Sequence, residues 1–141
     1  MGMRCMLSKT MPARLDSLHE ILAFISQHAR EKGFNKDSLN RMQLVAEEAL
    51  VNVFHYAYEH RAGGDVEVRL MEKDGPVLEV EIRDQGISFD PLSIGEPDVE
   101  AGISQRKIGG MGIFFVRKMA DEVRYRRETD TNILSLTFFN R

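Results

Sequence analysis

Cysteine is almost absent from this 141-residue chain, which contains only Cys5 and no cysteine and histidine cluster with the spacing of a zinc site. One cysteine excludes an internal disulfide. A chain of this length buries enough surface to fold without a covalent or metal crosslink. We therefore expect a single domain over residues 1–141 in a reducing cytoplasm.

Long apolar runs are missing as well. No segment approaches the roughly 20 apolar residues that span a bilayer, and the N-terminal segment lacks the apolar core of a signal peptide. The net charge is −3, and the short basic cluster Arg124, Arg126 and Arg127 is expected to form the solvated face of a strand. These features argue against a membrane protein and against direct binding of nucleic acid.

The apolar residues of the first half recur at helical spacing. Residues 3–10 are compatible with an edge strand, and a helix after Pro12 is expected to stop at Gly33. The apolar positions that predict this helix are Leu15, Leu18, Ile21, Leu22 and Ile25. A second helix is predicted to begin near residue 37 or 38 and to end before Gly63.

The second half alternates between strands and one helix. Residues 65–84 predict a β-hairpin that turns at Gly75-Pro76. A third helix is predicted over residues 113–121, followed by strands at about 122–129 and 132–139 that turn at Asp130-Thr131. The order lacks a repeated parallel βαβ unit. It predicts an α+β, two-layer sandwich with a mixed, mostly antiparallel sheet and about three helices on one face.

Between the hairpin and the third helix, residues from about 85 to 110 show no sustained period and contain many Gly, Pro, Ser and Asp residues. Such a long irregular segment is uncommon in a small domain and is usually functional. We interpret it as a lid.

Two polar residues lie four apart in the stretch VAEEALVNVFHYAY. Glu48 and Asn52 share a helix face, whereas Glu47 points elsewhere. A carboxamide oxygen is a suitable ligand for Mg²⁺, and a carboxylate one turn away can accept a proton. The alternative is an ordinary wet helix face.

A second motif, Asp84-Gln85-Gly86, ends a predicted strand. A carboxylate there can accept a hydrogen bond from an exocyclic amine such as adenine N6, and glycine lets a flat base approach the backbone. Guanine has an oxygen at the equivalent place, so this site would prefer ATP to GTP. The alternative is a common strand-ending turn.

The third motif, Gly109-Gly110-Met111-Gly112, precedes a helix. Successive N–H groups and the helix dipole there favour an anion such as phosphate. The motif is neither a P-loop, because no Gly-Lys-Ser/Thr follows, nor a dinucleotide fingerprint. The alternative is a flexible loop that meets a helix.

Taken in this order, the three motifs resemble those of the GHKL ATPase superfamily, whose members have the Bergerat nucleotide-binding fold. EEALVN resembles the N box, DQG the G1 box and GGMGIFFV the G2 box, and the likeness covers about residues 13–140. Within the superfamily, DQGISFD and the later Asp-Glu-Val strand are most similar to the stand-alone anti-sigma factor serine/threonine kinases.

The resemblance implies a role for each motif. Glu48 would be the general base, Asn52 the Mg²⁺ ligand, and Asp84 with Gly86 the adenine site, while residues Gly109, Gly110, Met111 and Gly112 would wrap the phosphates. Tyr56 stands where relatives often carry a basic residue or histidine. It is a candidate nucleotide contact, the alternative being a ring that fills space beside a core helix.

Phosphoryl transfer also needs positive charge near the γ-phosphate, for which Arg106 and Lys107 are candidates. Ile108 stands where some relatives carry arginine. The closing strand offers Thr131-Asn132-Ile133 in place of the Gly-Thr pair often found near adenine, and we assign no site role there.

By this resemblance the chain is an ATP- and Mg²⁺-dependent serine/threonine kinase of a small anti-anti-sigma protein that also holds a sigma factor. The first predicted helix matches a region that helps such kinases to dimerise, which is compatible with a homodimer. A different class of function is a non-catalytic switch that binds ATP and then a partner. A third, a hydrolase or detached histidine-kinase catalytic domain, is disfavoured because no phosphoacceptor helix is present.

Overall fold

The computed structural model describes the chain except for residues 1–3, 59–62, 89, 91 and 93–109, and describes only the backbone of residues 4–6 and 110–114. Its elements in chain order are β1 (Arg4–Pro12), a 3-10 turn (Leu15–Ser17), α1 (Leu18–Glu31), α2 (Lys36–Tyr56), β2 (Asp65–Glu72), β3 (Val77–Asp84), α3 (Gly110–Met119), β4 (Glu122–Glu128) and β5 (Thr131–Phe139). The predicted order of strands and helices is confirmed. Most of the predicted lid lies outside the described residues, as do Arg106, Lys107 and Gly109.

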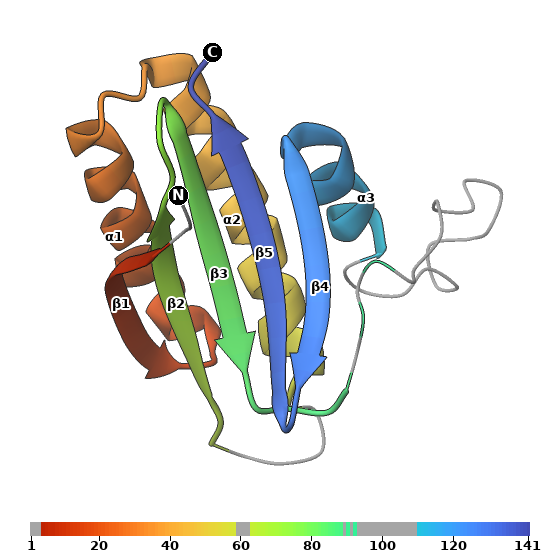
Figure 1. The fold of residues 1–141 in the computed structure, drawn as a ribbon. Coiled ribbons are helices and arrows are strands. Elements are labelled where there is room, and N and C mark those ends of the chain that lie inside the picture. Colours follow the sequence, from red (N-terminus) through yellow and green to blue (C-terminus); the bar gives the residue numbers. More distant parts are fainter. Residues whose placement is uncertain (1–3, 59–62, 89, 91, 93–109) are drawn as a thin grey trace, which may run out of the picture.

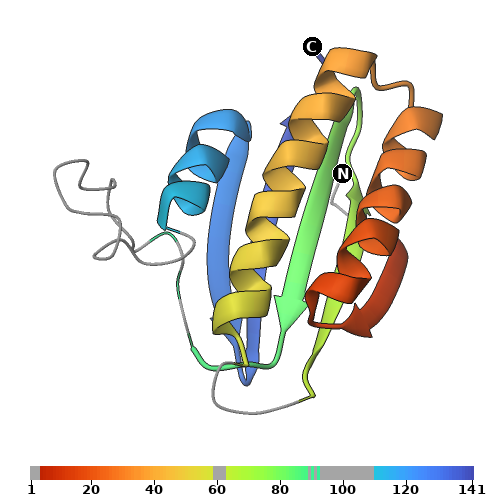
Figure 2. The same cartoon turned by 180° about the vertical axis from the view of Figure 1, so that it is seen from behind.

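The five strands form one sheet in the order β1-β2-β3-β5-β4. All four neighbouring pairs are antiparallel, so the mixed sheet that the sequence predicted contains no parallel pair. The reason is the position of β5, which separates β3 from β4, two strands that run in the same direction. All three helices of the described residues cover one face of this sheet, as predicted, and none of the described helices lies on the other face (Figures 1 and 2). Among the described residues, no helix is long and apolar enough to cross a membrane.

Local sequence ends α1 and starts α2. Gly33 has a φ of 97°. Its N–H donates to the carbonyl of Arg30, and the N–H of Phe34 to that of Ala29, each at 3.0 Å. This is a Schellman C-cap, in which glycine is favoured because it adopts a left-handed conformation without strain. Asn35 then caps α2, because its side chain accepts the N–H of Ser38 at 2.8 Å.

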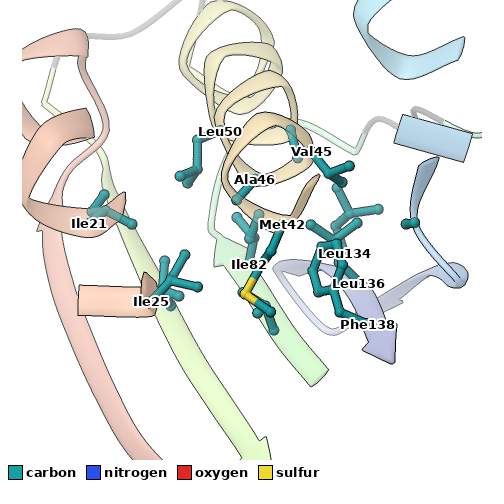
Figure 3. Close-up of a cluster of buried hydrophobic side chains, with 14 of the residues drawn as sticks. Ile21, Ile25, Met42, Val45, Ala46, Leu50, Ile82, Leu134, Leu136 and Phe138 are labelled. Carbon is teal, nitrogen blue, oxygen red and sulfur yellow. The ribbon is translucent and has the colours of Figure 1, made fainter. Parts of the chain in front are cut away.

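The core lies between the sheet and the helices. Ile21 and Ile25 of α1 and Met42, Ala46 and Leu50 of α2 are fully or almost fully buried. In Figure 3, Met42 lies beside Ile82, and Ile21 and Ile25 lie to one side of the labelled strand residues. The strand residues labelled there are Ile82, Leu134, Leu136 and Phe138. This packing fixes α2 over the centre of the sheet.

Paired charges cover the helix-free face. Glu81 is only 4% exposed, and it pairs with Arg83 at 2.8 Å and with Arg126 at 3.6 Å. Arg124 shares this face with Arg126, but Arg127 does not, because successive strand residues point to opposite faces. The expectation that all three arginines form one solvated face was therefore wrong.

Candidate functional site

A narrow pocket lies between the C-terminal half of α2, the end of β3 and the start of β5. Its lining residues are Asn52, Val53, Tyr56, Ala57, Asp84, Tyr125, Asn132 and Leu134. The structure thus brings together Asn52 and Tyr56 from the first predicted motif and Asp84 from the second. The pocket holds about 20 Å³, close to the space of one water molecule. A purine ring therefore requires the lining side chains to move.

Asn52 is a polar residue at a buried position of α2. Only 2% of the residue is exposed, and its carboxamide oxygen accepts no hydrogen bond from the part of the chain that the structure describes. Buried polar atoms usually have a partner, so an exception calls for an explanation. A lone amide oxygen is a suitable ligand for a hard cation such as Mg²⁺, and Asn52 fits the metal-ligand role that the resemblance implies.

Glu48 lies one helical turn before Asn52 and is half-buried. No hydrogen bond or ion pair from another described residue engages its carboxylate. Glu47 is half-buried too, so exposure does not distinguish the two acids. The position on the helix does, because only Glu48 shares a face with Asn52.

Asp84, at the end of β3, is only 6% exposed. Its Oδ1 accepts the N–H of Gly86 and the amide of Asn132, each at 2.9 Å. Burial raises the pKa of the Asp84 carboxyl above its ordinary value, whereas these two hydrogen bonds and the charge of Arg127 act to lower it. The site thus holds a carboxylate that has lost much of its hydration.

Gly86 has a structural reason to be glycine. A Cβ at this position would overlap the carbonyl of Ala57, beyond the last residue of α2. The same carbonyl accepts the N–H of Ile87 at 2.9 Å. The sequence predicted that a flat base would approach the backbone at Gly86. In the structure, the backbone of Ala57 makes that close approach.

Sequence reasoning missed Asn132, to which no role was assigned. Only 5% of this residue is exposed, and its amide reaches Asp84 from the neighbouring strand. The residue interrupts the otherwise apolar alternation of residues 132, 134, 136 and 138 on β5. A polar residue at an apolar position was the signal that could have identified it.

The structure describes some of the remaining predicted site residues but not all of them. The backbone of Gly110, Met111 and Gly112 forms the first turn of α3, which therefore begins earlier than the predicted residue 113. Tyr56 is half-buried and lines the pocket. Arg106, Lys107 and Gly109 lie outside the described residues.

A larger cavity of about 390 Å³ adjoins the pocket, because Asp84 lines both, and it is lined partly by the helix-free face of the sheet. Two of its charged residues are already paired within the protein. Arg69 bonds Glu67 at 3.0 Å, and Arg83 bonds Glu81 at 2.8 Å. The two arginines of this cavity are therefore engaged by carboxylates of the protein itself.

Comparison with known proteins gives a consistent result. Residues 11–138 match the family described as Histidine kinase-like ATPase domain. The chain is 28% identical over 134 residues to a protein of Bacillus licheniformis named Serine-protein kinase RsbW, with 92% of this chain and 83% of that protein covered. Identity to the protein of that name from Bacillus subtilis is 25%, with 92% and 82% covered.

Among solved structures, the fold is similar to a crystal structure of the RsbU and RsbW domains of a Mycobacterium tuberculosis protein, with a TM-score of 0.64 and 12% identity. The match covers 94% of this chain but only 32% of that longer chain. At this identity the likeness concerns the fold alone.

Proposed function

Because this chain belongs to the histidine kinase-like ATPase domain family, which its residues 11–138 match, we propose that it is an ATP-dependent protein kinase. It transfers the terminal phosphate of ATP to a serine or threonine of a small anti-anti-sigma protein. This transfer leaves the kinase free to hold a sigma factor. Relatives named serine-protein kinase support the reaction, and the likeness of DQGISFD to the anti-sigma kinases supports the partners.

The observation that carries the proposal is the buried oxygen of Asn52. It lacks a hydrogen-bond donor among the described residues, it lies one turn from Glu48, and it shares a pocket with Asp84. Among the described residues there is no group of three His, Cys, Asp or Glu side chains able to hold a metal. Phosphate and water oxygens would therefore complete the coordination of Mg²⁺.

In the proposed reaction Glu48 accepts the proton of the acceptor hydroxyl. The hydroxyl oxygen forms a bond to the γ-phosphorus, and the bond from that phosphorus to the bridging oxygen breaks, so that ADP leaves with the electron pair. When bound, Mg²⁺ neutralises charge on the phosphates. The half-buried carboxylate of Glu48 is free of other described partners, as a general base requires.

Phosphate binding is proposed for residues 109–112, with Arg106 or Lys107 close to the γ-phosphate. The position of Gly110 and Gly112 in the first turn of α3 supports this assignment, because the first N–H groups of a helix have no intrahelical acceptor. A cytoplasmic location and a homodimer remain predictions.

The test uses Glu48→Gln with Glu47→Gln as its matched control. Each purified chain is incubated with Mg²⁺, γ-labelled ATP and the small anti-anti-sigma proteins encoded in the same genome. We expect Glu48→Gln to slow phosphate transfer on the order of 1,000-fold, as loss of a general base does. ATP affinity measured by calorimetry should change by less than about threefold, and Glu47→Gln should transfer phosphate normally.

Two outcomes would contradict the kinase proposal. If the unaltered chain binds ATP and an anti-anti-sigma protein but labels no partner, it is an ATP-dependent switch. If Glu48→Gln transfers phosphate as fast as the unaltered chain, Glu48 is not the base.

A further inference from the structure

Three residues on neighbouring strands form one row beneath the candidate site. Asn132 of β5 lies opposite Asp84 of β3 and opposite Arg127 of β4. Directly opposed residues share a face of the sheet, and Asp84 and Asn132 both line the pocket beside α2. We refer to Asp84, Asn132 and Arg127 as the polar row.

The carboxamide of Asn132 connects the row in both directions. Its Nδ2 donates to Oδ1 of Asp84 at 2.9 Å and to the carbonyl of Ile87 at 2.7 Å. Its Oδ1 accepts from Nη1 of Arg127 at 3.0 Å and from the hydroxyl of Tyr125 at 2.6 Å. Because acceptors lie on one side and donors on the other, the network favours a single orientation of the amide.

Arg127 extends the row to the segment that follows β3. The same Nη1 donates to the carbonyl of Gly86 at 2.9 Å, next to the carbonyl of Ile87 that Asn132 holds. Two consecutive residues of this segment are thereby tied to the β4–β5 hairpin. These bonds restrain both the Asp84 side chain and the backbone after it.

Asp84 keeps one oxygen for a ligand. Its Oδ1 already accepts two hydrogen bonds, from Gly86 and Asn132. No donor among the described residues reaches its Oδ2, and the residue lines the pocket. The row therefore saturates one carboxylate oxygen and leaves the other available.

We propose that Arg127 and Asn132 are positioning residues that hold Oδ2 of Asp84 towards the pocket and thereby select a purine that carries an exocyclic amine. This inference rests on the proposed function, because it assumes that Asp84 accepts from the base of a nucleotide. Neither residue needs to touch the nucleotide. Their effect passes through Asp84.

A purely structural role for the row makes a different prediction. If Arg127 and Asn132 only stabilise the hairpin, their loss weakens the binding of all nucleotides to the same extent. If they position Asp84, their loss lowers the affinity only for nucleotides whose base carries the exocyclic amine. Adenosine and inosine triphosphates separate the two cases, because inosine carries an oxygen in place of that amine.

The experiment measures both affinities by calorimetry for the unaltered chain, Asp84→Asn, Arg127→Met, Asn132→Asp and a control, Arg124→Met. Arg124 lies on the same strand but on the opposite face, and its carboxylate partner at 3.6 Å, Glu122, is exposed. Met keeps most of the aliphatic stem of arginine. Asn132→Asp has the same shape but presents an acceptor to Asp84. Circular dichroism verifies that each variant is folded.

We expect the unaltered chain to prefer ATP to inosine triphosphate by about 10-fold, the effect of leaving one acceptor unpaired. Arg127→Met and Asn132→Asp should lose most of this preference and bind inosine triphosphate within about twofold of normal, whereas Arg124→Met keeps both values. Equal losses for the two nucleotides, or an unchanged preference in both row variants, would overturn the inference. If Asp84→Asn itself leaves the preference unchanged, the adenine assignment fails instead.

Discussion

The polar side chains at the two opposite ends of the sheet differ in whether their oxygens have partners within the described residues. Where β5 ends, near the C-terminus in Figure 1, Asp121 accepts the N–H of Phe139 at 2.7 Å and pairs with Arg141 at 2.8 Å and with Arg41 at 3.6 Å. We call Asp121, Arg41 and Arg141 the polar latch. Where β3 ends, at the candidate site, Asn52 has a buried oxygen without a donor among the described residues.

The difference indicates what each end does. In the latch, each carboxylate oxygen of Asp121 has a partner, which stabilises the fold, although Nε of Arg41 has no acceptor among the described residues. At the site, the buried oxygen of Asn52 costs stability until a ligand satisfies it. Functional sites commonly break the rules that govern the rest of a fold in this way. The same kind of substitution should therefore have opposite effects on stability at the two ends.

The largest effect is expected in the latch. Asp121→Ala should lower the free energy of unfolding by about 2 kcal/mol, because it removes the acceptor of the Phe139 N–H and the carboxylate beside Arg41. The side chain of Arg41 is only 14% exposed and would keep its hydrogen bond to the carbonyl of Phe139. Urea denaturation measures this loss. The matched control is Asp130→Ala, in an exposed turn, which should change stability by less than about 0.5 kcal/mol. A loss below about 1 kcal/mol for Asp121→Ala would show that the latch is not stabilising.

A smaller effect of opposite sign is expected at Asn52. Asn52→Leu should raise the free energy of unfolding of the nucleotide-free protein by about 1 kcal/mol, because it removes a buried acceptor that has no donor. ATP affinity should no longer increase when Mg²⁺ is added. Denaturation without nucleotide and calorimetry with and without Mg²⁺ test the two parts.

Asn40→Leu, an exposed change on the same helix, is the control and should leave the Mg²⁺ response intact. If Asn52→Leu destabilises the free protein and keeps the Mg²⁺ response, the comparison between the two ends is wrong.

The smallest effect concerns pH. Burial raises the folded-state pKa of Asp84 above its ordinary value of 3.8, so the native state binds the proton more tightly than the unfolded state. The stability that the Asp84 carboxyl contributes is fully present when the pH is below that ordinary value. It is lost as the pH rises through the raised, folded-state pKa. The stability difference between Asp84→Asn and the unaltered chain should therefore grow over this window, in favour of the variant.

Denaturation at a series of pH values measures this difference. Asp130→Asn, in the exposed turn, should give a difference that does not vary over the same window. A difference that shrinks with rising pH for Asp84→Asn would mean that burial does not dominate at this carboxyl.

Much of the fold was predictable because its signals are local. The apolar spacing that ends at Gly33 predicted α1, and the alternation over residues 65–84 predicted the β2–β3 hairpin. The Glu48 and Asn52 pair was predictable for the same reason, since residues four apart on a helix share a face. The last turn was placed one residue late, because Glu128 pairs with Thr131 and leaves Thr129 and Asp130 in the loop.

The polar row was not predictable in this way. Asn132 is 48 residues from Asp84 in the sequence, and nothing local indicates that the two meet. Arg127 looked like part of a basic cluster with Arg126 until the pairing of β4 showed that the two point to opposite faces. Strand order, which places β5 between β3 and β4, decides both contacts.

The sequence by itself determined the helices, the strands and the side chains that each helix face or strand end presents, because these depend on the periodicity of neighbouring residues. Only the tertiary structure decided that Asp84 receives its partner from β5, that the oxygen of Asn52 is buried without one among the described residues, and that Gly86 is required by the backbone of Ala57. These features depend on packing between distant segments, and packing joins residues that sequence spacing does not relate.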